Sequence, residues 1–302
     1  MSRLQERIAG APITWGVCEV PGWGYQLPPE RVLQEMSEIG LRATELGPDG
    51  YLPTDAPGLR DTLARHHLRL VAGFVPLVLH RGDRLSDELA QAGRAVNLLG
   101  ALGCRVLVLS AASDETGYEG KVVLDGDAWN NLVEGIDRVV SLAGEHGLSV
   151  ALHPHFGTVI EGPDDVNRLL ETSTVSLCID TGHLLIGGAD PVAVVRAARE
   201  RVVHVHLKDI DGVLAERVRA GSLGYHEAVR GGLYRPLGAG VVDVASIVAT
   251  LEGRGYRGWY VLEQDAVLEA TAGRRPGPSE DARASLAFLG RIAARIESGI
   301  SA

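Results

Sequence analysis

Five of the ten histidines of this chain lie between residues 153 and 206, in three short segments that read LHPH, CIDTGH and VVHVHLKD. Each segment stands at or just beyond the end of an apolar run with strand character, and Glu263 ends the run WYVLE in the same way. Imidazole and carboxylate groups at strand ends are the ligand types of divalent transition-metal sites. The sequence therefore predicts a metal site held by residues from several strands.

Short apolar runs alternate with amphipathic segments from one end of the 302-residue chain to the other. This alternation is typical of βαβ units and a parallel sheet. Several amphipathic segments open with Pro or Asp and close at Gly, as helices do. Strands are predicted at residues 12–16, 43–46, 70–74, 106–109, 149–153, 176–180, 202–207 and 259–263. The pattern predicts an α/β fold, a single (β/α)8 TIM barrel domain over residues 1–302, with a last helix at 279–298.

The connection after the seventh predicted strand, residues 209–241, is longer and richer in Gly than the others. Its basic side chains are Arg217, Arg219, His226, Arg230 and Arg235. Loops of that length are functional or disordered in most proteins, and on a barrel this one follows a strand at the catalytic face. We expect this insertion to cover a substrate, with a surface or oligomer-contact segment as the alternative.

The carboxyl ends of the strands of a parallel barrel meet at one face, so residues distant in sequence come together there. The last four predicted strands are neighbours, and one cation could take a ligand from each. The ligands that we expect are Asp180, His206 and Glu263, with His153 as the fourth. Two carboxylates and two imidazoles suit Mn²⁺, Co²⁺, Fe²⁺ or Zn²⁺ better than Mg²⁺ or Ca²⁺. Taken singly, Asp180 could be a helix cap, and His204 is expected to be a hydrogen-bonded core histidine.

A metal at this face could chelate the carbonyl and a neighbouring hydroxyl of a polyhydroxy ketone and stabilise the enediolate formed by loss of the α-proton. The reaction then needs an acid and a base. The candidates are Lys208, His155 and Glu45. The side chain of Lys208 is expected to point to the same side of the seventh strand as that of His206, and Glu45 ends the second predicted strand. Sequence alone assigns none of them as acid or base, and Glu45 could instead face solvent or pair with an arginine.

Residues after the first and third predicted strands are candidates for the wall of a substrate pocket. Trp15, Glu19 and Trp23 lie in TWGVCEVPGWGY, where aromatic rings could stack on a sugar or inositol ring. Both tryptophans have the alternative of filling a hydrophobic core. His80, which ends FVPLVLH, could line the same pocket.

The formal net charge of −10, from 29 basic and 39 acidic residues, would repel a phosphodiester backbone and argues against nucleic acid as a partner. No apolar stretch approaches the roughly 18 residues of a membrane span, and the first residues have no signal-peptide core. A soluble cytoplasmic protein without a membrane partner is expected. Cys18, Cys104 and Cys178 lack CxxC spacing and are expected to pack in the core.

Several of these motifs together resemble the xylose-isomerase-like barrel superfamily of sugar isomerases, epimerases and dehydratases. They are CIDTGH, HVHLKD, GAGVVD and GYRGWYVLEQD. In that superfamily the metal is commonly held by a Glu on the fifth strand, the Asp of D-x-x-H, a His on the seventh strand and a Glu on the eighth. The resemblance implies Asp180, His206 and Glu263 as ligands, and His183 as a substrate contact. His153 stands at the place of the fifth-strand Glu, either as a substitute ligand or beside a three-ligand site.

Within the superfamily, HPHFGT, CIDTGH, HVHLKD and ATELGP look most like the inosose dehydratases of inositol catabolism. The resemblance implies a lyase with one divalent metal, Mn²⁺ or Co²⁺ before Zn²⁺ or Fe²⁺, that dehydrates a cyclic keto-polyol such as 2-keto-myo-inositol. A sugar or inosose isomerase or epimerase is the nearest alternative, because it would use the same site. The related barrel endonucleases would need a basic groove, against which the net charge argues. A non-catalytic barrel that binds a sugar or a protein is the remaining alternative, and homo-oligomers are common in the family.

Overall fold

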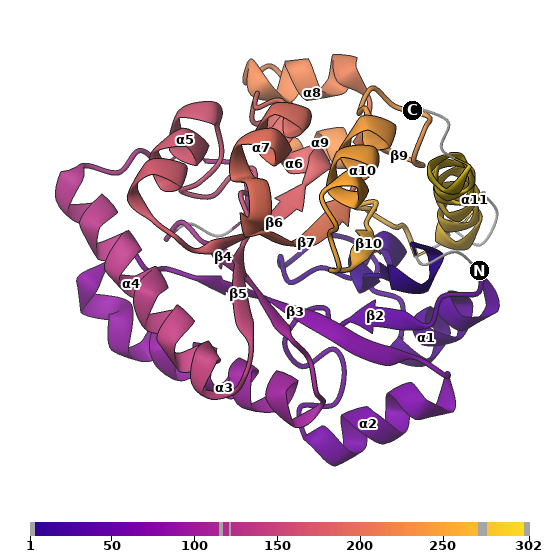
Figure 1. Cartoon of the computed structure of the whole chain (residues 1–302), viewed down its shortest axis with the longest axis horizontal. Helices are drawn as coiled ribbons and strands as arrows, with labels where there is room; N and C mark the ends of the chain where they lie inside the picture. The colour runs from indigo at the N-terminus through magenta and orange to yellow at the C-terminus, as the bar shows by residue number, and fades with distance from the viewer. Residues whose placement is uncertain (1–3, 115–116, 121, 271–276, 299–302) are drawn as a thin grey trace.

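The computed structural model describes residues 4–114, 117–120, 122–270 and 277–298 of the chain. Parallel strands close into a barrel in the order β1-β10-β7-β6-β5-β4-β3-β2. These strands are β1 (Ile8–Gly10), β2 (Ala43–Glu45), β3 (Arg69–Leu77), β4 (Val106–Ala111), β5 (Ser149–Leu152), β6 (Ser176–Asp180), β7 (Val202–Leu207) and β10 (Tyr260–Leu262). The predicted (β/α)8 barrel is confirmed (Figure 1).

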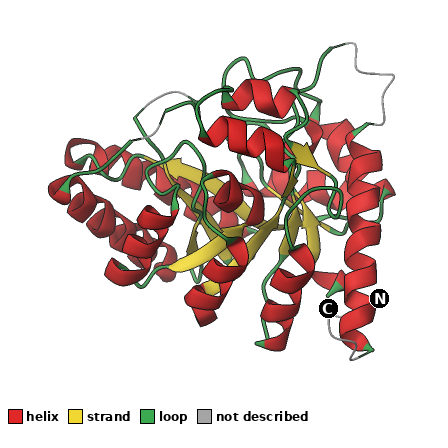
Figure 2. Cartoon of the chain, turned by 90° about the horizontal axis from the view of Figure 1, so that it is seen from above, coloured by secondary structure: helices red, strands yellow, loops and turns green. Residues whose placement is uncertain are grey.

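Helices surround the strands, which lie at the centre of the molecule (Figure 2). They are α1 (Pro29–Glu38), α2 (Ala56–Arg65), α3 (Leu85–Ala101), α4 (Gly126–Glu145), α5 (Pro163–Thr172), α6 (Thr181–Ile186), α7 (Pro191–Ala198), α10 (Val244–Gly253) and α11 (Pro278–Glu297). The side chains of Asp55, Asp125 and Asp190 each accept a hydrogen bond from a backbone N–H of the helix that follows. These caps satisfy donors that the first turn leaves free, so the helices begin where the sequence indicates.

The prediction of a first strand at residues 12–16 is wrong. Strand β1 lies earlier and pairs with β10 and β2, while Pro12–Trp15 forms a short 3-10 helix that ends at Gly16 with a φ of 77°. Pro12 cannot donate to a strand ladder, and its fixed φ favours the first turn of a helix. As a result, Trp15 packs against α1, where its indole Nε1 donates to Glu35 Oε2 at 2.8 Å.

The interior of the barrel is filled by small apolar side chains of the central strands. A buried cluster inside it consists of Ala72, Val106, Val108, Ala151 and Cys178. Residues two apart on a strand face the same side, so Ser110 follows Val108, and Asp180 follows Cys178, on the inward face. The residues that end this face therefore point into the mouth of the barrel, at the carboxyl ends of the strands.

The long connection after β7, residues 209–241, folds into small elements of its own. They are β8 (Asp209–Ile210), α8 (Gly212–Arg219), α9 (Tyr225–Arg230) and β9 (Tyr234–Arg235), and β8 pairs with β9 in antiparallel orientation. The Asp209 carboxylate accepts hydrogen bonds from the backbone N–H groups of Gly238, Gly240 and Val242, each at 2.9 Å. This buried carboxylate holds the return of the connection against β8.

Among the residues that the structure describes, none of the helices is both long enough and apolar enough to cross a membrane. 

Candidate metal centre and active site

Three predicted metal ligands meet where β6, β7 and β10 end. One ligand atom from each of Asp180, His206 and Glu263 lies within 4.8 Å of the others. His206 Nδ1 is 3.2 Å from Glu263 Oε2 and 3.7 Å from Asp180 Oδ2. All three side chains are buried. Two carboxylates and one imidazole in this arrangement suit a divalent transition metal.

The local fold fixes the orientation of Asp180. Its Oδ1 caps α6 by accepting hydrogen bonds from the backbone N–H groups of Gly182 and His183, at 2.9 and 2.8 Å. Its other oxygen, Oδ2, faces His206. The helix cap and the candidate ligand role therefore use different oxygens of one carboxylate. Burial raises the pKa of Asp180, but the Lys208 ammonium and nearby imidazoles outweigh this effect, and the pKa lies well below its ordinary value.

Glu45, at the end of β2, holds the other side of the His206 ring. Glu45 Oε1 lies 3.0 Å from His206 Nε2 and 2.7 Å from Nε2 of His204, which is a hydrogen-bonded core histidine as predicted. Glu45, His204 and His206 form a candidate metal set of their own, but both imidazoles already hydrogen-bond to the same oxygen. A carboxylate in this position orients a histidine so that its second nitrogen can bind a metal. That nitrogen, His206 Nδ1, makes no hydrogen bond among the described residues, so the donor set fits a cation.

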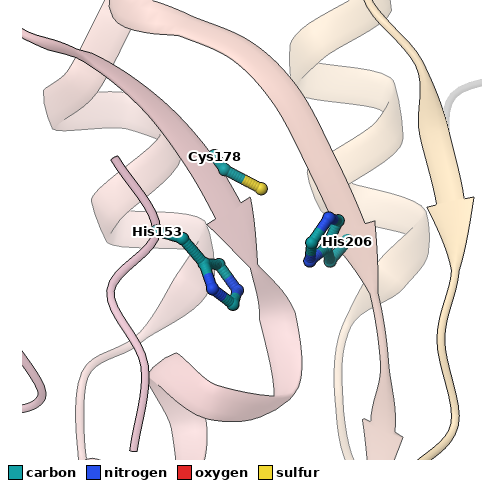
Figure 3. Close-up of side chains that lie close together, drawn as sticks. All are labelled: His153, Cys178 and His206. Carbon is teal, nitrogen blue, oxygen red and sulfur yellow. The ribbon is translucent and has the colours of Figure 1, made fainter. Parts of the chain in front are cut away.

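His153, the fourth predicted ligand, follows β5 and points toward His206 (Figure 3). Its Nε2 is 3.3 Å from Asp180 Oδ2. His153, Cys178 and His206 form a further candidate metal set. Burial raises the pKa of Cys178 to about 11. Cys178 lies two residues before Asp180 on β6, deeper in the barrel. Carboxylates suit ions such as Mn²⁺ better than a soft thiolate does, so the set of two carboxylates and His206 is favoured over the set with the thiol.

The surroundings of these ligands favour positive charge. Burial lowers the pKa of His206, but the carboxylates of Glu263 and Glu45 outweigh this effect and raise the pKa well above its ordinary value. Lys208 shows the same balance, because the carboxylates around it raise its pKa well above the ordinary value in spite of burial. The cluster of acids thus attracts cations, which supports a metal-binding role.

Lys208 lies directly beside the candidate ligands. Its Nζ is 3.0 Å from Glu263 Oε2 and 3.2 Å from His183 Nε2. The same ammonium donates a short hydrogen bond to Asp265 Oδ1. Asp265 in turn accepts a hydrogen bond at 3.1 Å from the hydroxyl of Tyr225, which belongs to α9. The insertion after β7 is therefore connected to Lys208 through one carboxylate.

A cavity of about 70 Å³ opens at the mouth of the barrel beside these groups. The predicted residues that line it are Glu19, Trp23, Glu45, His153, His155, His206, Lys208 and Glu263. Tyr225 also lines the cavity, so the insertion does contribute a wall residue, as expected of a segment that covers a substrate. The expected basic side chains of this insertion are not among the described lining residues.

Two buried histidines next to the cavity are neutral. His155 Nδ1 donates to the carbonyl oxygen of Phe156 at 2.6 Å, which leaves the lone pair on Nε2. Burial lowers the pKa of His155 well below its ordinary value, and burial does the same at His183. The two rings stack with centroids 3.6 Å apart. His155 can therefore accept a proton, whereas Lys208 can donate one.

Four predicted residues are not among the described residues that line the cavity: Trp15, His80, Asp180 and His183. Asp180 and His183 are buried just behind its wall. Trp15 fills the core beneath α1, which is the alternative that the sequence left open. His80 is half-buried just beyond β3, and burial lowers its pKa.

The chain matches the family described as "Xylose isomerase-like TIM barrel" over residues 33–292. This protein belongs to that family. The resemblance seen in CIDTGH and HVHLKD is thus confirmed, and the closed parallel barrel agrees with it.

Two related proteins cover most of this xylose isomerase-like barrel. The inosose dehydratase of Geobacillus kaustophilus (strain HTA426) is 32% identical over 270 residues, which cover 86% of this chain and 87% of the relative. The rhizopine catabolism protein MocC of Rhizobium meliloti is 33% identical over 272 residues, which cover 87% of this chain and 83% of the relative. Among solved structures, L-ribulose 3-epimerase has a TM-score of 0.70 and 18% identity, with 98% of both chains covered. At that identity the structural likeness supports the fold alone.

The residues of the cavity in this xylose isomerase-like barrel that sequence reasoning misses include Tyr118, Tyr225 and Asp265. Asp265 could have been predicted from the sequence. It follows Glu263 by two residues in LEQD, so its side chain could point to the same side of the strand. Tyr118 and Tyr225 lie in or after long connections without periodic patterns. Nothing in the sequence around them indicates which wall they form.

Proposed function

We propose that this protein is a divalent-metal-dependent lyase that removes water from a cyclic keto-polyol such as 2-keto-myo-inositol. The observation that carries the proposal is the meeting of Asp180, His206 and Glu263 beside the Lys208 ammonium at the mouth of the barrel. The names of relatives support the choice of reaction, since two at 32% and 31% identity are inosose dehydratases.

The cation would be held by Asp180, His206 and Glu263, with His153 as the fourth ligand in the place of the family's fifth-strand Glu. This donor set suits Mn²⁺ or Co²⁺, with Fe²⁺ and Zn²⁺ as alternatives. Such an ion, when bound, polarises the ketone of the substrate and so acidifies the neighbouring C–H group. Glu45 is assigned to orienting His206 rather than to proton transfer, because two imidazoles engage its Oε1.

His155 is assigned as the base that removes the α-proton. Its Nδ1–H is bound to a carbonyl oxygen, and its Nε2 lone pair remains available beside the cavity. The depressed pKa keeps this ring neutral at physiological pH. A neutral imidazole in contact with the substrate is a competent general base.

Lys208 is assigned as the acid that protonates the leaving hydroxyl. The carboxylates around it keep it charged, and its hydrogen bond to Asp265 fixes the direction of the ammonium. The C–H electrons form the new double bond, the C–O bond breaks, and the hydroxyl departs as water with the proton from Lys208. The proton gained by His155 equals the proton lost by Lys208, so exchange with solvent restores both groups.

The remaining wall of the cavity suits a ring that carries hydroxyl groups. Glu19 offers carboxylate oxygens as acceptors, and Trp23 and Phe74 offer apolar faces. A few polar groups on an otherwise apolar wall are typical of sites that orient small ligands. His183 lies behind this wall, with its Nε2 3.2 Å from Lys208 Nζ, and is assigned to supporting Lys208 rather than to the predicted substrate contact.

An epimerase of a ketose or inosose is the second candidate. The observation in its favour is that His155 and Lys208 are two separate proton-handling groups at one cavity. If Lys208 returned a proton to carbon instead of oxygen, the stereocentre would be inverted rather than eliminated. L-ribulose 3-epimerase shares the fold, which is compatible with this alternative.

The test is proton NMR in D₂O of 2-keto-myo-inositol with protein loaded with Mn²⁺ or Co²⁺, the paramagnetic ion being removed before spectra are recorded. Conversion to a dehydrated dione is expected for the native protein and not for His206→Ala. His146→Ala, on the exposed end of α4, is the matched control and should retain activity. Deuterium incorporation into an intact or inverted ring would favour the epimerase, and an unchanged spectrum would refute both candidates.

A further inference from the structure

A second cavity lies beside the first, on the side of the barrel mouth where β3 and β4 end. Its volume is about 170 Å³. Residues that line it include Glu19, Pro76, Ser110, Ser113, Tyr118 and Thr158. We call it the β4 cavity. No role in metal binding or proton transfer falls to Ser110, Ser113 or Thr158.

Ser110 gives the β4 cavity an unused polar group. It lies on the inward face of β4, near the carboxyl end of the strand, and is only 1% exposed. Its Oγ makes no hydrogen bond among the described residues. A buried hydroxyl without a partner loses the hydrogen bonds that it would make in water. A ligand in this cavity that offers a hydroxyl group would supply the missing partner.

Tyr118 and Glu19 line both cavities and stand between them. The Tyr118 hydroxyl donates a short hydrogen bond to Glu19 Oε1, and the Tyr118 ring stacks on His155 with centroids 4.4 Å apart. The pair of Glu19 and Tyr118 is therefore a wall that the two cavities have in common.

A six-membered ring with an oxygen on each carbon is larger than the part of it that can contact the metal ligands. When its ketone faces those ligands, the ring presents further hydroxyls on its opposite side. The β4 cavity is an adjoining space for them, because it shares Glu19 and Tyr118 with the first cavity.

We propose that the β4 cavity is a subsite for the part of a neutral, hydroxyl-bearing ring that lies farthest from the metal ligands, with Ser110 Oγ as its hydrogen-bonding anchor. The subsite rests on the proposed function in so far as the ligand is a polyol. Glu19 and Tyr118 exchange their mutual hydrogen bond for bonds to the ring hydroxyls when the ligand enters. These two residues and Ser110 then determine which polyols fit.

The chemistry of the wall selects an uncharged ligand. Ser110 and Ser113 provide hydroxyls, Glu19 provides a carboxylate, and no Lys or Arg is among the described residues that line the β4 cavity. The Thr158 hydroxyl is already bonded to the carbonyl oxygen of His155 at 2.8 Å. A phosphorylated or carboxylated sugar would therefore meet no cation there and would face the Glu19 charge. Neutral polyols are the class that this subsite accepts.

Two variants test the subsite from different directions. Ala112→Leu fills the β4 cavity from its own wall without touching the first cavity, and Ser110→Ala removes the anchor while it leaves the space. Ala90→Leu, on the exposed side of α3, is the matched control for added volume. Each protein is loaded with Mn²⁺, and its affinity for myo-inositol, which lacks the reactive ketone, is measured by isothermal titration calorimetry. KM and kcat for 2-keto-myo-inositol are measured in parallel.

The expected result is a dissociation constant for myo-inositol raised roughly tenfold or more by Ala112→Leu and about five- to tenfold by Ser110→Ala, with Ala90→Leu unchanged. KM should rise by similar factors. Native affinity and native KM in both cavity variants would overturn the subsite while the dehydratase stands. Weakened polyol binding without turnover in any protein would overturn the dehydratase while the subsite stands. Absence of both binding and turnover in the native protein would overturn both.

Discussion

Neutralising Glu263 distinguishes between the three overlapping sets of candidate metal ligands. Glu263→Gln keeps the shape of the side chain but removes a charge whose oxygen lies 3.2 Å from His206 Nδ1. The sets built on Cys178 and on Glu45 do not contain Glu263. We therefore expect this one change to abolish tight Mn²⁺ binding only if Asp180, His206 and Glu263 hold the cation.

The expected size of the effect follows from the role of Glu263 as a direct ligand. Loss of a residue that merely supports a ligand weakens metal affinity about 10- to 100-fold, so loss of a ligand charge should cost roughly 100-fold or more. At a Mn²⁺ concentration about 100 times the native dissociation constant, bound metal stabilises the native protein by about 2.7 kcal/mol, and the variant by about 0.4 kcal/mol. A chain of 302 residues unfolds with an entropy of about 0.6 kcal/mol/K, so the Mn²⁺-induced rise in Tm should shrink by about 4 °C.

The assay combines bound Mn²⁺, measured by electron paramagnetic resonance, with Tm measured in the presence and absence of the ion. Cys178→Ala is the control, and its Mn²⁺ affinity should stay within about threefold of the native value because Mn²⁺ prefers carboxylate and imidazole ligands to a thiolate. Native Mn²⁺ affinity in Glu263→Gln, or its loss in Cys178→Ala, would refute the assignment of ligands.

Three further predictions follow from contacts around the site. Lys208→Gln should lower kcat about 10²- to 10⁴-fold while bound Mn²⁺ is retained. Turnover is measured by NMR, and bound Mn²⁺ is measured by metal analysis. Loss of the metal would instead mean that Lys208 supports the ligands. Glu45→Gln should raise the Mn²⁺ dissociation constant about 10- to 100-fold, because His206 loses its orienting carboxylate; kcat loss at saturating metal would make Glu45 a proton-transfer group after all. Asp209→Ala should lower the free energy of unfolding by about 3 kcal/mol, since three backbone N–H groups lose their acceptor; a urea titration measures this, and an unchanged midpoint would show that the bonds contribute nothing.

The ligand side of the site could be predicted from sequence because strands have a fixed period. Side chains alternate between two faces of a strand, so Asp180 at the end of β6 and His206 near the end of β7 could be assigned to one face of the barrel. The structure pairs these two residues in register. Neighbouring parallel strands then bring together residues that are distant in sequence, and no information about the loops is needed.

The opposite wall of the cavity could not be predicted in this way. Tyr118 and Tyr225 reach the cavity from connections without a repeating pattern, and their positions depend on contacts between separate loops. For example, Glu119 accepts hydrogen bonds from the backbone N–H groups of Tyr225 and His226, each at 2.9 Å. This pairing connects the segment after β4 to the insertion after β7. Nothing in the sequence of either segment predicts this contact between them.

The error in the first strand shows why the site survives local mistakes in such a prediction. Displacing the strand from residues 12–16 to β1 moved Trp15 from the expected pocket wall to the core. The candidate ligands were unaffected, because they lie on β6, β7 and β10 and depend only on the order and direction of those strands. The position of a residue in the wall of the cavity is harder to predict, since it depends on the path of one loop. The candidate metal ligands are therefore the part of this site where inference from sequence is strongest, and the proposed preference for a polyol is the part that must be measured.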